Sequence, residues 1–187
     1  MKLTITALAL LLPALAVAAP AAERRPEIAT MEGGFSGRPA RLTLLRREWR
    51  IAGEINGQEV KVAIDNEAKT VTGSANGQPV ALTFDATPER TSYKGAVNGS
   101  TIEYSIDWQA GVIDGAANGS KLHLEFNLDG GTVDRKKSAL NGAPVGLTLE
   151  AASGRLSGTI GGKDIGLTLT DADLADFLEN LYLFVKP

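Results

Sequence analysis

The sequence contains no cysteine and a single histidine, His123. The absence of cysteine excludes disulfide bonds, a cysteine-linked lipid anchor and a thiol nucleophile. One histidine leaves only one candidate base for a catalytic triad, and its acidic neighbours on nearby predicted strands are Glu103 and Glu125. Since the strand pattern places His123 on a solvent-facing side, we expect no catalysis there. The protein is predicted not to be an enzyme.

Net charge and aromatic content are also low. The formal net charge is −3, aromatic residues make up 5% of the chain, and the longest basic run is residues 135–137. This charge balance argues against nucleic acid as a partner. The glycine-rich segments are not followed by Gly-Lys-Ser or Gly-Lys-Thr, so they are not phosphate-binding loops. We therefore expect no bound cofactor.

An extended apolar run occurs near the N-terminus, over residues 8–17. Lys2 precedes it, and residues 16–18 (Ala-Val-Ala) offer the small side chains that a signal peptidase reads. The run is shorter than the roughly 20 residues that a membrane span needs. The pattern predicts a signal peptide over residues 1–18 and a linker over residues 19–27. Because disulfides are absent, the predicted location is the bacterial periplasm or outside the bacterial cell.

Glycine, in contrast, is abundant, with 21 residues. Seven glycines recur every 20 to 23 residues, and five of them follow asparagine: Gly37, Gly57, Gly77, Gly99, Gly119, Gly142 and Gly162. Asn-Gly flanked by alternating apolar residues is the strongest short signal for a β-hairpin, because a type I′ turn needs positive φ at both central residues. The spacing predicts seven hairpin repeats of about 21 residues over residues 28–170.

The turns also fix which residues lie opposite one another. If Asn76-Gly77 is a two-residue loop, Gly73 lies opposite Val80 and Val71 lies opposite Leu82. Side chains alternate between the two faces of a strand, so each pair shares a face. The resulting apolar face includes Val80, Leu82, Phe84, Ile102, Tyr104, Ile106, Leu122, Leu124 and Phe126. The opposite face carries Lys61, Thr83, Glu103, Ser105, His123, Glu125, Thr148 and Thr168.

This pattern predicts an all-β protein: an up-and-down antiparallel meander of about 14 short strands with one apolar face. A flat sheet of that size would be roughly 65 Å wide and mostly uncovered, so it must curl into a barrel or flatten into a sandwich. Mid-strand glycines such as Gly73 allow this bending. The predicted strands of about 6 to 8 residues, polar on one face, are too short for a membrane barrel, so the protein is not expected to span a membrane.

After Thr170 the apolar period becomes helical, with Leu174, Phe177, Leu178, Leu181 and Phe184 at helical spacing. Residues 171–187 are predicted to form an amphipathic helix of about 14 residues that packs on the repeat domain. Three roles are compatible with the pattern. The helix can cap an end or the inner face of the sheet, as repeat proteins require, or it can be a plug or latch over a ligand cavity. The third role, a helix that binds a membrane surface or a partner, is disfavoured because its polar face is acidic rather than basic. A closed round barrel favours an internal occupant, because side chains alone fill barrels of only about eight strands.

Two further features have alternative interpretations. Four acids occupy equivalent positions at one rim of the predicted sheet: Asp65, Asp85, Asp107 and Glu150. A calcium site is one interpretation of this rim, but calcium needs six to eight converging oxygens, and turn initiation explains the acids more simply. We therefore expect no metal. Residues 128–138 interrupt the repeat with a charged insertion, in which Lys136 takes the position that Ile113 holds in the preceding repeat. This insertion is either a functional loop or a decayed repeat, and we favour decay.

The preferred functional hypothesis is a non-catalytic exported protein with a structural or protein-interaction role in the bacterial cell envelope. The alternative is a periplasmic carrier that holds an apolar ligand, such as a lipid, against the apolar face under the C-terminal helix. The predicted partner is accordingly a protein or an apolar small molecule, and no oligomeric state is predicted. The candidate ligand-binding residues on the apolar face and the helix are Trp49, Phe84, Tyr104, Phe126, Phe177 and Phe184.

Overall fold

The computed structural model describes residues 25–185. The predicted signal peptide, most of the predicted linker and the last two residues therefore lie outside the described part of the chain. Within it, the strands extend from Ile28 to Thr170, and two short helical segments follow. No helix in this part is long and apolar enough to cross a membrane.

Ten strands form the first five hairpins in regular succession. They are β1 (Ile28–Phe35), β2 (Arg38–Leu45), β3 (Arg50–Ile55), β4 (Gln58–Asp65), β5 (Thr70–Ala75), β6 (Gln78–Ala86), β7 (Arg90–Val97), β8 (Ser100–Asp107), β9 (Val112–Ala117) and β10 (Ser120–Asn127). A 3₁₀ turn, η1 (Arg46–Glu48), lies between β2 and β3. The later strands are β11 (Thr132–Val133), β12 (Ala139–Leu140), β13 (Ala143–Pro144), β14 (Gly146–Glu150), β15 (Arg155–Ile160) and β16 (Lys163–Thr170).

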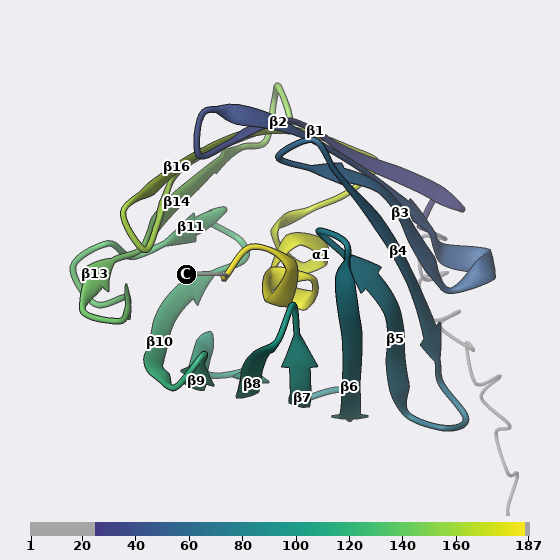
Figure 1. The fold of residues 1–187 in the computed structure, drawn as a ribbon. Coiled ribbons are helices and arrows are strands. Elements are labelled where there is room, and N and C mark those ends of the chain that lie inside the picture. Colours follow the sequence, from purple (N-terminus) through teal and green to yellow (C-terminus); the bar gives the residue numbers. More distant parts are fainter. Residues whose placement is uncertain (1–24, 186–187) are drawn as a thin grey trace, which may run out of the picture.

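Neighbouring strands pair antiparallel, and the sheet closes on itself (Figure 1). β1 pairs with β16, while β11 bridges β10 and β14. Of the 16 strands in the sheet, β12 and β13 extend from β10 outside this ring, which leaves 14 strands in the closed barrel. The predicted meander is confirmed, and the alternative between barrel and sandwich is resolved in favour of the barrel.

The predicted register is also confirmed. Gly73 lies opposite Val80, and Val71 lies opposite Leu82. Both central residues of each predicted turn have positive φ, as a type I′ turn requires; at Asn76 and Gly77 the values are 53° and 69°. We call the end of the barrel that carries these seven turns the turn end. The opposite end, where residues 46–49, 66–69, 87–89, 108–111, 128–131 and 151–154 join successive hairpins, is the link end.

Glycine is required in the middle of the strands because the backbone bends sharply there. Gly73 has φ of +145°, and a Cβ atom at this position would lie 2.0 Å from the carbonyl oxygen of Lys61 on the neighbouring strand. The same conformation and close approach recur at Gly33, Gly53, Gly95, Gly115 and Gly158. Repeated once in each regular hairpin, this bend curls the sheet until its edges meet.

The sixth hairpin differs from the others, and Ser138 occupies its glycine position. Here the chain leaves the barrel wall: β11 contributes two residues to the ring, and the chain then forms the small hairpin β12–β13 before returning as β14. The prediction that Lys136 takes the strand position equivalent to Ile113 is wrong, because Val133 occupies it and pairs with Leu147. The additional residues therefore lie after the barrel strand, and the buried Val133 preserves the apolar interior.

The C-terminal segment lies inside the barrel. It consists of α1 (Leu174–Glu179) and the 3₁₀ turn η2 (Leu181–Leu183), which Figure 1 shows in the centre of the ring of strands. The helix is shorter than predicted, since α1 has six residues and Asn180 ends it. It is also not amphipathic in the expected sense. The barrel surrounds the segment, so apolar side chains are buried on several sides of it: Leu174, Phe177, Leu178, Leu181, Leu183, Phe184 and Val185. We call residues 174–185 the plug.

Candidate functional site

The link end contains two adjoining hollows where the plug meets the wall. One has a volume of about 200 Å³ and the other about 320 Å³, and both are lined by Trp49, Ile64, Glu179 and Asn180. The smaller hollow, which we call the link-end cleft, is completed by aromatic residues of the wall and plug: Phe84, Tyr93 and Tyr182. The larger hollow extends toward the basic side chains of Arg25, Arg46 and Arg50.

An ion-pair cluster fixes the plug at this end. Asp176 is 4% exposed, and its carboxylate accepts a hydrogen bond of 2.9 Å from Arg46, which begins η1. Arg25 donates a second, at 3.3 Å. Asp173 and Asp176 also form a capping box, in which each side chain accepts a hydrogen bond from the other's backbone N–H. Because charge-assisted bonds to a buried carboxylate are strong, this cluster determines how the plug begins.

All three tyrosines of the chain meet beside the cleft. The ring centroid of Tyr93 lies 5.5 Å from that of Tyr104 and 5.6 Å from that of Tyr182, so one cluster joins β7, β8 and the plug. Burial raises the pKa of each phenol well above its ordinary value, and neighbouring groups add to the effect. These tyrosines therefore remain neutral and act as aromatic surface rather than as proton-transfer groups. The Tyr182 hydroxyl also donates a hydrogen bond of 3.2 Å to the side-chain oxygen of Asn180.

Glu179 is the charged residue among the side chains that line the cleft. It is half-buried at the last position of α1, and no hydrogen bond or ion pair joins it to another residue of the described chain. Burial raises the pKa of its carboxyl group, as does the nearby charge of Asp176, while Arg25 and Arg46 oppose this shift. A carboxylate in such a setting is a favourable position for a positively charged group.

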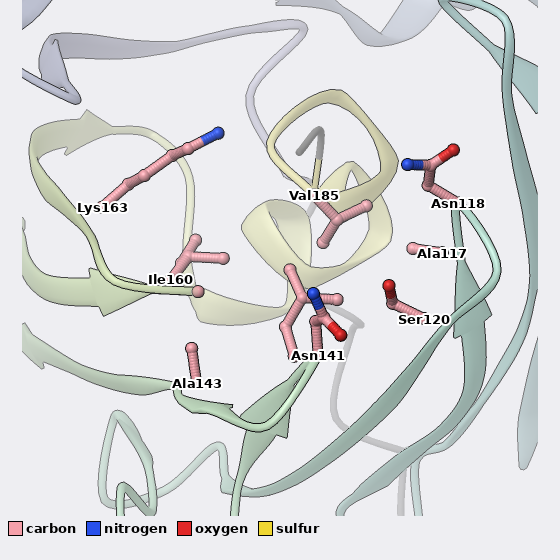
Figure 2. Close-up of a pocket in the computed structure, with 10 residues that line it drawn as sticks. Ala117, Asn118, Ser120, Asn141, Ala143, Ile160, Lys163 and Val185 are labelled. Atoms are coloured by element: carbon pink, nitrogen blue, oxygen red, sulfur yellow. The ribbon is translucent and has the colours of Figure 1, made fainter.

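The turn end has two hollows of a different kind. One, of about 110 Å³, lies between the β12–β13 hairpin and the end of the plug; Figure 2 shows Asn118 and Lys163 approaching Val185 from opposite sides. The other, of about 370 Å³, is lined in part by Asn56, Asn76 and Arg38. The side-chain oxygens of Asn56 and Asn76 are buried and have no hydrogen-bond partner among residues 25–185. The linings of these hollows are richer in amide side chains than the link-end cleft, and Phe35 is their one aromatic residue.

The outer face carries His123 and its acidic neighbours. Nδ1 of His123 lies 2.5 Å from a carboxylate oxygen of Asp114 on β9, and Nε2 lies 3.9 Å from Glu125. The expected neighbour Glu103 instead forms an ion pair with Lys94 at 3.2 Å. Residues 25–185 contain no group of three or more side chains arranged to hold a metal ion.

Two of the four rim acids, Asp65 and Asp107, act as turn residues. The Asp65 carboxylate accepts hydrogen bonds from the backbone N–H groups of Glu67 and Ala68, and the Asp107 carboxylate accepts one from that of Ala110. Asn127 acts in the same way toward Gly130. These contacts support turn initiation as the reason why acids and asparagine recur at the ends of the hairpins.

The six candidate ligand-binding residues are distributed over three regions. Phe177 and Phe184 are fully buried in the plug, with ring centroids 5.0 Å apart. Tyr104 and Phe126 lie on the interior wall, and Phe126 packs edge-on against Trp108 at 5.9 Å. Only Trp49 and Phe84 line the link-end cleft. Trp49 is not on the interior face of a strand: it follows η1 at the rim and is 54% exposed.

Sequence reasoning did not select Tyr93, Tyr182 and Glu179. For Tyr93 the signal was present, because the two-residue loop at Asn98-Gly99 places it opposite Tyr104, as observed. Tyr182 and Glu179 carried no such signal, because their position depends on the path of the plug through the barrel. Comparisons with known protein families, with curated proteins and with solved structures found no match.

Proposed function

We propose that this protein is an exported, non-catalytic module of the bacterial cell envelope that binds a partner at its link end. The observation that carries this proposal is the asymmetry of the exposed surface. The exposed large apolar side chains of the described chain are Ile28, Trp49 and Leu128, and each belongs to the link-end rim. The three residues stand at separate points around that rim, and none of the exposed large apolar side chains of the described chain lies at the turn end. This restriction to one end of the barrel favours a contact surface there.

The filled interior supports a binding role at the rim over transport of a ligand inside the barrel. A lipid held against the apolar face would have to replace the plug, because Phe177 and Phe184 occupy that space. The burial of seven apolar side chains in the plug stabilises the fold by something on the order of 10–20 kcal/mol. This is as large as the whole stability of a typical domain, about 5–15 kcal/mol. The geometry therefore favours the protein-interaction hypothesis over the carrier hypothesis.

Site-specific photo-crosslinking in cells of the native host tests the proposal. A photoreactive residue is placed at Trp49 or Leu128, and a matched control is placed at Gln78, which is exposed at the turn end. We expect the two link-end positions to yield the same crosslinked product and the turn-end position to yield none. Equal yields from both ends, or none from either, would contradict the proposal. Native mass spectrometry of the same preparation shows whether lipid is bound, which would support the carrier instead.

A further inference from the structure

We propose that the link-end cleft binds an alkylammonium group. The Glu179 carboxylate is the counter-ion, and the aromatic walls are Trp49, Phe84, Tyr93 and Tyr182. This inference deepens the proposed function, because it names the chemistry that the link end recognises. The ammonium group can belong to a lysine side chain of a partner or to a small molecule such as choline.

The first argument is the charge inventory around the cleft. Arg46 and Arg25 are paired with Asp176, and Arg25 also lies 3.5 Å from Asp173. Arg50 lies 3.9 Å from Glu48. Once these contacts are assigned, Glu179 remains as a half-buried negative charge with no contacting partner in the described chain. A carboxylate withdrawn from water without a partner is costly, and an incoming cation would relieve that cost.

The second argument is the chemistry of the walls. A metal ion is a poor match, because calcium needs six to eight oxygen ligands, whereas Glu179 supplies the single carboxylate of the cleft lining and most other lining side chains are aromatic or aliphatic. An alkylammonium group matches both parts of the cleft: aromatic faces attract cations and also accommodate the attached carbon atoms. The volume of about 200 Å³ is suited to a compact group of this kind rather than to a lipid chain.

The chain itself already places an ammonium group against one of these walls. Nζ of Lys69, in the link between β4 and β5, lies 5.6 Å from the ring centroid of Phe84. The Phe84 face is therefore accessible to a cation from the link end. Lys69 is exposed, so its ammonium group can withdraw, but it competes with an incoming cation by charge repulsion.

The experiment is a titration of the full mature protein, followed by intrinsic fluorescence and calorimetry. The Trp108→Phe background leaves Trp49 as the reporting tryptophan. The probes are choline, its neutral isostere 3,3-dimethyl-1-butanol, and n-butylammonium as the equivalent of a lysine side chain. We expect saturable binding of at least one cation and binding of the neutral isostere that is at least about tenfold weaker, a difference of about 1.4 kcal/mol. The preference between choline and n-butylammonium identifies the source of the group.

Two substitutions and a control complete the test. Glu179→Gln should weaken cation binding about tenfold or more without loss of folded structure, because the amide keeps the shape and removes the charge. Lys69→Asn should tighten it, because asparagine tolerates the positive φ of 54° at this position and removes the competing charge. His123→Gln on the outer face should change nothing.

Equal binding of choline and its isostere, unchanged binding by Glu179→Gln, or absence of binding by every cation at millimolar concentration would overturn the inference. Its failure is distinguishable from failure of the proposed function. If crosslinking at Trp49 and Leu128 persists in the Glu179→Gln variant while no cation binds, the link end is a contact surface and the ammonium site is refuted.

Discussion

The wall and the plug of this barrel are built on opposite principles. The wall repeats one unit, and the local sequence of each regular unit determines its conformation. Each unit has a turn dipeptide with two positive φ values, an alternation of apolar and polar residues, and a glycine where the strand bends. The plug occurs once, and contacts with distant strands determine its position. Phe184, for example, packs edge-on against Phe35 of β1 at 5.5 Å, while Tyr182 packs against Tyr93 of β7.

This difference shows how a repeat array becomes a closed domain. Local rules make a curved sheet, but 14 strands enclose more space than their own side chains can fill. The non-repeated segment supplies the missing core, and it also creates irregular surfaces where wall and plug residues meet, among them the link-end cleft. The predictions below test this division of roles, beginning with the largest expected effect.

Removal of the plug should abolish the folded barrel. A chain that ends at Thr170 loses the seven buried apolar side chains of the plug and exposes the interior face of the wall. We expect an expanded, dye-binding or aggregated species by size-exclusion chromatography and 1-anilinonaphthalene-8-sulfonate fluorescence. A soluble monomer with an intact β-sheet signal in circular dichroism would show instead that the wall is stable alone.

A single large-to-small substitution inside the plug should strongly lower the free energy of unfolding, although part of the protein should still fold. Phe177→Ala removes a fully buried ring that contacts Phe184 and is expected to cost about 3–5 kcal/mol in the free energy of unfolding. Chemical denaturation with urea measures this loss. Phe84→Ala is the matched control on the wall: its ring is only partly buried, so a smaller loss is expected. Equal losses would contradict the assignment of the plug as the centre of the core.

Within the wall, two glycines of one hairpin should respond differently. Gly73→Ala meets both strained φ and the carbonyl oxygen of Lys61, whereas Gly77→Ala meets strain alone, because nothing lies within 4 Å of a Cβ atom there. We expect losses of about 3 and about 1–2 kcal/mol respectively. Similar values for the two variants in urea unfolding would show that the close approach between strands does not determine the bend.

The anchor of the plug should contribute less than its buried rings. Arg46→Met removes the 2.9 Å bond to Asp176, together with the exposed bonds from Arg46 to the backbone carbonyls of Pro26 and Asp171, and leaves Arg25 as the remaining cationic partner of Asp176. The expected cost is about 2 kcal/mol, in the range for a charge-assisted hydrogen bond. Arg47→Met is the control, because Arg47 is exposed and lies 3.7 Å from Glu27 in a surface ion pair. A double variant with Asp176→Asn that shows additive losses would indicate that the two residues are not coupled.

The smallest effect concerns pH. The pKa of Glu179 is raised in the folded protein, so the protonated form is favoured by folding. The stabilisation from this group is fully present below the unfolded pKa and is lost as pH rises through the folded pKa. Glu179→Gln should therefore be at least as stable as the parent at neutral pH. As the pH rises through the folded pKa of Glu179, the melting temperature of the variant should fall less than that of the parent. A variant that is less stable than the parent at pH 7 would mean that Glu179 has a stabilising partner.

Much of the wall was predictable from sequence, because its information is local. The turn at Asn76-Gly77 fixed the pairing of Gly73 with Val80, and the same arithmetic held in the other regular hairpins. The sixth hairpin was predicted wrongly. Its Asn141-Gly142 turn is regular, but the strand before the turn leaves the barrel wall after Val133, so Val133 takes the wall position that the repeat spacing assigned to Lys136. A turn signal does not report whether the strands on either side of it remain in the larger sheet.

The plug and the cleft were less predictable, for a physical reason. The apolar spacing from Leu174 to Phe184 indicated a helix but not that apolar groups would be buried on several sides, because that depends on how many strands surround it. No local sequence pattern marked Glu179 as a site residue, because an acid near the end of a short helix is common. Its environment is defined by Trp49 and Tyr93, which the tertiary fold brings to the same cleft. Sites formed between a repeated wall and a single insertion are set by the tertiary fold.

Amide hydrogen exchange in the plug tests the central claim most directly. The backbone N–H groups of Leu183 and Phe184 form hydrogen bonds within the plug, that of Phe177 donates to the carbonyl of Asp173 just before it, and all three residues are enclosed by the barrel. If the plug is part of the core, these amides should exchange only through global unfolding, at the same free energy as those of Leu82 on β6 and Ile102 on β8. Exchange of the plug amides at rates typical of an exposed chain end, with the strand amides still protected, would contradict the account.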